Sequence, residues 1–302
     1  MKTSKKTKYL FLSLILCICV TKNAYTKIFS PSIKTGIKYC SVYELLNSKY
    51  SSVSKLVWKN PLNPYFGFNG NIYVSNFICN VDIDFSISNA WGIMEDFDYY
   101  MSGEICQYSK HTNHLDNDHS FYVDFGYDFN LKKLSVTPMI GCQYQSREFS
   151  AVNGYLQIPE IGKNWEGNEE KRIISGKGID YEQKLFLPFI KMSINYSFKK
   201  DFSIRGSIRF STYLYATCID THYFRNKQFI DKINGGFCLC GEAKLHLKKY
   251  SFVFSNEYLK TFPNAKTYTQ DIGITDSKRY LCKNYIPGIE SSIWYVGIEY
   301  TL

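Results

Sequence analysis

The chain has 302 residues and a formal net charge of +9, with 36 basic and 27 acidic side chains. Five of the lysines lie within the first 24 residues, a segment without acidic residues. The rest of the chain is therefore near +4, which gives no support for a nucleic-acid partner. Aromatic residues make up 17% of the chain, and this excess is the more informative feature of the composition.

The first 24 residues have the pattern of a secretory signal peptide. Lysines precede an apolar run from Tyr9 to Val20, and the small residue Ala24 follows. The run is too short for a transmembrane helix. The alternative of a lipoprotein modified at Cys17 or Cys19 lacks small residues before either cysteine. We expect a signal peptide over 1–24 and one barrel domain over 25–302, whose eight cysteines enter a compartment that permits disulfides.

Apolar and polar residues alternate with a period of two along much of the chain. Such runs cover 77–88, 121–130, 186–198, 202–214 and 294–302. A soluble β-sandwich also alternates, so the decision rests on other features. The apolar positions are rich in aromatics, the opposite positions carry charges such as Asp82, Asp84, Arg205 and Arg209, and the connections alternate between short and long. All three features are typical of outer-membrane barrels.

The alternating runs predict an all-β fold, a ten-stranded antiparallel transmembrane β-barrel of the bacterial outer membrane. A sheet in lipid must close, and an even strand number places both ends on one side. The strands are expected near 34–46, 53–75, 76–88, 119–131, 133–152, 179–199, 201–219, 229–249, 250–267 and 288–302. Tight turns are expected near 75–76, 131–133, 199–201 and 249–250, and long loops near 89–118, 153–180, 219–228 and 268–287.

Two short polar motifs, GIMEDFDYY and CIDTHYF, supply a candidate active site. Asp96 and Asp98 are two residues apart, as are Asp220 and His222. In an extended segment such pairs share a face, and by strand order the two pairs lie across the barrel mouth. A histidine oriented by a carboxylate and facing two further acids is equipped to activate water. Strict alternation from Phe202, however, puts Asp220 and His222 on the lipid face, so a bulge must re-aim them.

Each motif also has an ordinary interpretation. An Asp-x-Asp pair in a polar segment is usually a solvated turn. His111, His114 and His119 cluster in the same region and raise the possibility of a metal site. Because no ligand spacing with cysteine or carboxylate recurs around them, we expect no metal.

With these motifs the chain resembles the omptins, a family of outer-membrane proteases of Gram-negative bacteria. The likeness covers most of the chain after the leader and includes SKLVWK (54–59), MEDFDYY (94–100), SKH (109–111), MIGCQYQSR (139–147), YEQKLFLPFI (181–190) and IDTHYF (219–224). The resemblance implies a ten-stranded barrel with its active site outside the cell, and cleavage of protein or peptide substrates by a monomer held in outer-membrane lipid.

The resemblance also implies roles for the two motifs. Asp220 and His222 match the family's catalytic dyad, and Asp96 and Asp98 match its paired aspartates. A water would be held between His222 and Asp96 and activated by His222. His111 matches a histidine that recurs in the family, with a structural or supporting role.

Two departures from the family pattern bear on specificity and activation. The family's acids for a basic substrate residue fall here on Cys218 and near Cys40, with Glu44 close by. We therefore expect Cys40 and Cys218 to contact substrate, and the basic-residue preference to be missing. The family's fifth-strand residues for lipopolysaccharide fall on Cys142, Tyr144 and Ser146 in ungapped register, and Arg147 fits only after a slip of one residue.

The sequence thus predicts an aspartic-type outer-membrane endopeptidase of omptin type that acts at the cell surface. We expect no cofactor, and lipopolysaccharide as an activator stays open. The alternative is a non-enzymatic outer-membrane barrel that serves as an adhesin or a narrow porin.

Overall fold

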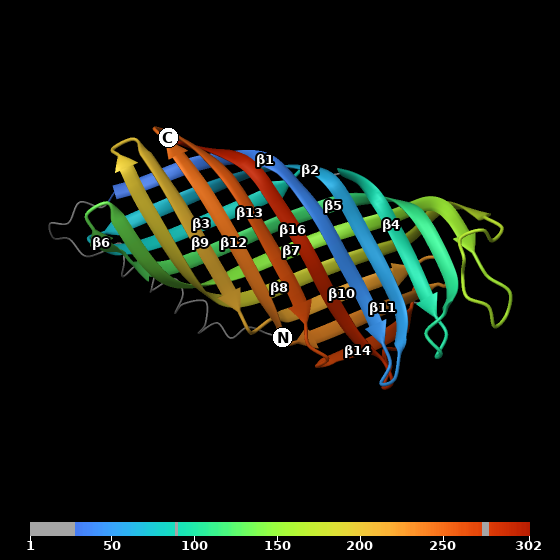
Figure 1. The fold of residues 1–302 in the computed structure, drawn as a ribbon. Helices are drawn as coiled ribbons and strands as arrows, with labels where there is room; N and C mark the ends of the chain where they lie inside the picture. Colours follow the sequence, from blue (N-terminus) through green and yellow to red (C-terminus); the bar gives the residue numbers. More distant parts are fainter. Residues whose placement is uncertain (1–27, 88–89, 274–277) are drawn as a thin grey trace.

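The computed structural model describes residues 28–87, 90–273 and 278–302, which form one antiparallel sheet closed on itself (Figure 1). The predicted signal peptide lies outside the described residues and stays a prediction. Ten strands form the ring: β1 (Ile28–Asn47), β2 (Ser52–Val74), β3 (Phe77–Ser86), β5 (Ile105–Tyr127), β7 (Leu134–Gln157), β8 (Arg172–Lys199), β9 (Phe202–Ser211), β12 (Gly236–Leu247), β13 (Tyr250–Thr261) and β16 (Ile286–Thr301). Because β16 pairs back with β1, the predicted ten-stranded barrel is confirmed.

Four further strands extend this ring at one end. β4 (Ala90–Tyr99), β10 (Tyr215–His222), β11 (Lys227–Asn234) and β14 (Ala265–Asp271) lie beyond short breaks next to β3, β9, β12 and β13 in the chain. The remaining two strands, β6 (Phe129–Leu131) and β15 (Tyr280–Leu281), are short. The described chain contains no helix long and apolar enough to cross a membrane.

The four predicted tight turns are confirmed at one end of the barrel, at residues 75–76, 132–133, 200–201 and 248–249. The predicted long loops are mostly wrong. Residues 90–99 and 105–118 are strand, and the other strands also run further than expected, leaving connections at 48–51, 100–104, 158–171 and 223–226, with the short β15 between β14 and β16. Alternation of apolar and polar residues fades in the extensions because their inward faces mix apolar side chains such as Met94 with acids such as Asp96, so the pattern ended before the strands did.

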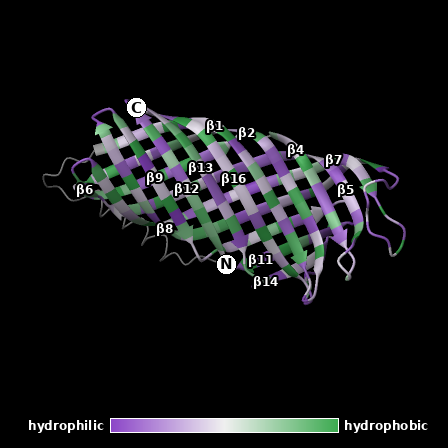
Figure 2. Cartoon of the chain, in the orientation of Figure 1, coloured by the Kyte–Doolittle hydropathy of each residue, from purple (hydrophilic) through white to green (hydrophobic). Residues whose placement is uncertain are grey.

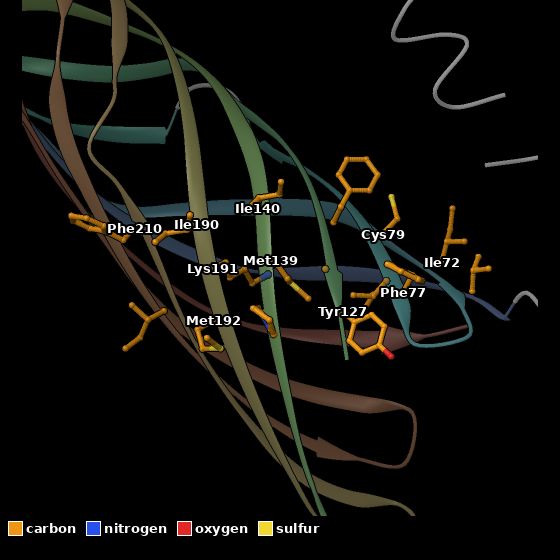
Figure 3. A pocket seen from close by; sticks show the side chains of 16 residues that line it. Ile72, Phe77, Cys79, Tyr127, Met139, Ile140, Ile190, Lys191, Met192 and Phe210 are labelled. Carbon is orange, nitrogen blue, oxygen red and sulfur yellow. The ribbon is translucent and has the colours of Figure 1, made fainter. Parts of the chain in front are cut away.

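The outer surface carries the apolar half of the alternation (Figure 2). Large apolar side chains are exposed on every strand of the ring, as with Phe68, Ile140 and Ile190. A groove of about 1010 Å³ lies on this face across β2, β3, β5, β7, β8 and β9 (Figure 3). Nearer the extensions the outward side chains become charged, as with Lys59 and Lys184, which marks the end of the apolar belt. An outer face of this kind is built to contact lipid.

The barrel interior is divided into layers, and successive inward side chains of β1 belong to each of them. Lys34, near the tight turns, forms ion pairs with Asp82 and Asp84 in a polar lumen. Lys38 lies four residues further along the same face of β1. It donates a hydrogen bond to Asp118, which also accepts a hydrogen bond from Arg147. This second layer is almost completely buried, with Lys38 and Arg147 each 1% exposed.

An apolar plug fills the barrel beyond that charged layer. Trp58 is fully buried and stacks on Phe149 at 5.4 Å and on Tyr181 at 5.8 Å between ring centroids. Val42 from β1 and Met94 from β4 belong to the same buried cluster. The barrel is therefore packed through its cross-section here, and whatever lies outside the plug is separated from the polar lumen.

The plug predicts that stability is concentrated at Trp58. Replacing Trp58 by alanine removes a fully buried indole between two rings, and we expect a loss of about 3–5 kcal/mol in the free energy of unfolding. Urea titration of the barrel refolded in detergent measures this. Trp91→Ala is the matched control, because the Trp91 side chain is 60% exposed on the outer face. Equal losses for the two variants would contradict the plug.

Candidate active site

The chain reverses its inward and outward faces just before Asp220 and His222. Along β9 the odd-numbered side chains, such as Ser207 and Ser211, point inward and are buried. Residues 212–214 leave the extended ladder, and from β10 onward the even-numbered side chains are buried instead. This break is the irregularity that the sequence required, and it turns Asp220 and His222 into the barrel mouth.

Asp220 and His222 are hydrogen-bonded to one another on this inward face. The distance from His222 Nε2 to Asp220 Oδ2 is 2.5 Å, and both residues are buried. The carboxylate accepts the proton of Nε2, so the neutral ring carries its lone pair on Nδ1. The Phe229 ring packs edge-on against the imidazole, with 5.5 Å between the ring centroids. The pair is therefore oriented like a general base and its supporting acid.

Asp96 and Asp98 lie on β4, which pairs with β2 and β5. Asp96 is 6% exposed, and the Ser54 hydroxyl lies 3.4 Å from its Oδ1. Asp98 accepts a hydrogen bond of 3.0 Å from the Gln107 side chain. Both carboxylates are therefore held by neighbouring strands, so their position is set by the sheet and not by a flexible loop.

One cleft of about 200 Å³ brings the two motifs together. Asp98, Asp220 and His222 line it, and Arg225 Nη2 lies 3.4 Å from Asp98 Oδ2 across it. β4 and β10 are separated by several strands on either side of the sheet, so the cleft spans the barrel mouth as the sequence predicted. Asp96 is not among the residues that line this cleft, but its carboxylate raises the pKa of His222, and His222 lowers the pKa of Asp96.

Burial and mutual charge shift the acidity of this group. Burial, followed by repulsion from Asp98, raises the pKa of Asp96 to about 7. Burial alone would lower the pKa of His222, but the Asp220 and Asp96 carboxylates outweigh it and leave that pKa above its usual value. Near neutral pH, Asp96 and His222 therefore compete for protons, as groups of an acid–base pair do.

Two further buried acids, Glu44 and Asp231, line the same cleft. Asp231 pairs directly with Cys218 across β10 and β11. Burial raises the pKa of Asp231 to about 7 and holds the pKa of Glu44 well above its usual range. The sequence analysis missed Asp231, whose only signal was its inward position opposite Cys218. Glu44 had been noted only as a neighbour of Cys40.

Neither of the two cysteines that were expected to contact substrate is among the described residues that line the cleft. Cys218 is buried below Asp220 on the inward face of β10, next to the Asp231 position. Cys40 is also buried, but Glu44, four residues further along the same face of β1, takes its place at the cleft. Both thiols are free, as are those of the other described cysteines.

His111 lies on β5, is 5% exposed and is not among the residues that line the cleft. Its Nδ1 is 2.8 Å from the Asn153 carbonyl oxygen, and its Nε2 is 3.1 Å from the Ser109 hydroxyl. Burial lowers the pKa of His111, so the ring stays neutral. Both of its nitrogens are occupied by the hydrogen bonds to Asn153 and Ser109. The described residues contain no group of three side chains placed to hold a metal ion.

The lipopolysaccharide residues suggested by the sequence lie on both faces of β7. Cys142, Tyr144 and Ser146 alternate onto the outer face of β7, where Tyr144 is exposed and Ser146 is covered by its neighbours. Arg147 points into the barrel and donates a hydrogen bond of 3.1 Å to Asp118. The register with a slip of one residue is therefore wrong, because it needs Arg147 on the lipid side.

Comparison with known proteins identifies the family to which this architecture belongs. A family model described as the Omptin family matches residues 32–302. The chain is similar to the outer membrane protease OmpT from Escherichia coli, with a TM-score of 0.79 and 16% identity over 93% of this chain and 99% of that chain. A weaker likeness, with a TM-score of 0.40 and 11% identity over 97% of both chains, is to the transport unit of the autotransporter AIDA-I from Escherichia coli. No curated protein sequence matches.

The fold defines a bacterial outer-membrane β-barrel with an acidic cleft at one end. Because the family model covers nearly the whole described chain, the protein belongs to the omptin family and is an outer-membrane protease by class. The resemblance inferred from the motifs is thereby confirmed.

The geometry predicts that Asp220 sets the proton affinity of His222. Asp220→Asn removes the charge that faces Nε2 while burial remains, so the pKa of His222 should fall. Histidine side-chain NMR of the barrel in detergent measures it. Asp128→Asn is the control, because Asp128 lies near the tight turns, bonded to Thr137. An unchanged His222 midpoint in Asp220→Asn would contradict the assignment.

Proposed function

We propose that the protein hydrolyses peptide bonds with a water molecule activated between His222 and Asp96. The observation that carries this proposal is a hydrogen-bonded Asp220–His222 pair that lines one cleft together with Asp98, with the buried Asp96 close enough to raise the pKa of His222, in a barrel of the omptin family. The resemblance assigned these roles residue by residue, and the geometry is compatible with them. No covalent intermediate and no cofactor are required.

Each group has a defined part in the proposed reaction. The Nδ1 lone pair of His222 accepts a proton from water while the hydroxide adds to the peptide carbonyl carbon. Asp220 holds the ring in the necessary tautomer and stabilises the imidazolium that forms. The imidazolium then returns its proton to the leaving amine as the C–N bond breaks. Asp96, hydrogen-bonded to Ser54 and backed by Asp98, positions the water.

The rival function is a non-enzymatic barrel. A narrow porin needs a continuous aqueous path, whereas the described interior holds a fully buried Trp58 and a 1% exposed Arg147 across its width. An adhesin remains compatible with the outer shape, but it has no use for four acids and a histidine that line one cleft, all but Asp98 of them buried. The packing and the cleft therefore support the protease.

Two substitutions test the mechanism. His222→Ala and Asp96→Ala should each lower kcat/KM for a fluorogenic peptide mixture by about 10³-fold or more, because each removes a group that acts on the water. Activity should also fall as pH drops through the raised pKa of His222, since only the neutral ring is a base.

His119→Ala is the matched control, because the His119 ring contacts Tyr144 on the outer face. Correct assembly is checked by the compact migration of unheated barrels in gels. Near-normal cleavage by a folded His222 or Asp96 variant would refute the mechanism, with or without lipopolysaccharide in the assay.

We also propose that the cleft prefers a neutral substrate residue at and below neutral pH. Cys218 provides no charge, and the two acids beside it, Glu44 and Asp231, have raised pKa values. Protonated carboxyls accept neutral side chains, whereas ionised ones attract lysine or arginine. We therefore expect no preference for basic residues at pH values below the pKa of Asp231. Above that pKa, the ionised carboxylate should begin to favour lysine and arginine.

A peptide library profiled at pH 6 and at pH 9 tests this preference. Neutral residues should dominate before the scissile bond at pH 6, and arginine or lysine should gain several-fold at pH 9. Asp231→Asn should suppress that gain. Strong selection of arginine or lysine already at pH 6 would defeat the proposal.

A further inference from the structure

Arg225 connects the two walls of the cleft. It lies in the 223–226 turn between β10 and β11, three residues after His222. Its Nη2 reaches Asp98 Oδ2 on β4 at 3.4 Å. Among the described residues that line the cleft, Arg225 is the only lysine or arginine, and it faces the acids Glu44, Asp98, Asp220 and Asp231. A single cation thus occupies a cleft that otherwise attracts cations.

The turn that carries Arg225 is anchored, while the side chain is free to move. The Tyr223 amide donates to the Gly178 carbonyl, and the Asn226 carbonyl accepts from the Ile272 amide. The Arg225 side chain, in contrast, is 51% exposed and makes one long contact to a carboxylate. Exposed ion pairs of this kind contribute little to stability, so this contact is readily exchanged.

Unsatisfied acceptors remain in the cleft despite the presence of Arg225. Asp220 Oδ1, Asp231 Oδ1 and Glu44 Oε2 are buried and make no hydrogen bond within the described part of the chain. Gln107 and Arg225 are the two donors to Asp98 Oδ2, and only Arg225 is charged. A donor group of a substrate therefore finds buried acceptors on the floor and one replaceable cation at the rim.

We propose that Arg225 is a specificity-determining residue that occupies the Asp98 side of the cleft and gives it up to a cationic side chain of the substrate. In the substrate-free protein its guanidinium is an internal competitor, which lowers affinity for cations at this position. An incoming lysine or arginine side chain replaces one ion pair by another, and Arg225 moves into solvent. This proposal rests on the proposed peptidase function for its biological meaning, but the competition itself does not require cleavage.

Arg225 also acts on the groups proposed to handle the proton. Its charge lowers the pKa of Asp96 and the pKa of His222. Larger effects act on the same two groups: burial and Asp98 raise the pKa of Asp96, and the Asp220 and Asp96 carboxylates raise the pKa of His222 against the lowering by burial. Removing Arg225 should therefore move the acidic limb of the pH profile upward, which a purely structural role of the turn would not do.

The direct experiment measures binding without catalysis. Fluorescein-labelled hexa-D-lysine, which resists hydrolysis, is titrated against the refolded barrel by fluorescence anisotropy at low salt. Arg225→Gln should bind about 2- to 5-fold more tightly than the unmodified chain, as expected for release of one exposed ion pair. The gain should vanish in Asp98→Asn/Arg225→Gln and shrink at high salt. Arg225→Lys should bind like the unmodified chain.

Lys227→Gln is the matched control. It removes the same charge two residues away, but Lys227 pairs with Asp271 on β14 and does not line the cleft. Equal tightening in Lys227→Gln, or unchanged or weaker binding in Arg225→Gln, would overturn the proposal. Cleavage is then followed separately, where Arg225→Gln should lower KM for lysine-containing peptides and shift the acidic limb upward. If the unmodified chain cleaves nothing while Arg225→Gln still binds more tightly, the proposed function fails and the role of Arg225 stands.

Discussion

The stacked rings of Trp58, Phe149 and Tyr181 are the constraint on which the rest of the structure depends. An open barrel of this width would fill with water and leave the acids at its mouth solvated, with ordinary pKa values. The plug closes the barrel beneath them, so Asp96 and Asp231 are buried although they lie at the outer end. Desolvation is accordingly the largest cause of the raised pKa of both groups. The alternating pattern of a membrane strand does not by itself produce an apolar plug that closes the barrel.

A second constraint is the change of face at residues 212–214. In lipid the alternation is strict, because every second side chain must be apolar. Beyond the apolar belt this requirement ends, and the chain can bury the opposite set of side chains. The break therefore lies where the strand leaves the belt. It lets two consecutive strands with the same even-numbered spacing present Ile208 of β9 to the outside and His222 of β10 to the cleft.

The sequence was sufficient for the part of the fold that lipid controls, and less so for the part beyond it. Period-two runs located the ten strands and the tight turns, because each run alternates between lipid and lumen. They ended too early at Asp118, where both faces of β5 are polar. The motif residues Asp96, Asp98, Asp220 and His222 could be predicted from spacing and family likeness. Asp231 could not, because its place beside Cys218 is a matter of cross-strand register.

The position of Asp231 shows how charge is distributed in such a cleft. Where one strand carries the uncharged Cys218, the adjacent strand places a carboxyl directly opposite it. Asp231 is 5% exposed, and one of its oxygens has no partner within the described part of the chain, so its charge is costly by itself and favourable beside a cation. Arg225, at the rim of the cleft beside Asp98, carries a positive charge that offsets part of the negative charge of these acids. The charge that a substrate encounters is therefore set jointly by a buried acid that can hold its proton and an exposed arginine that can move away.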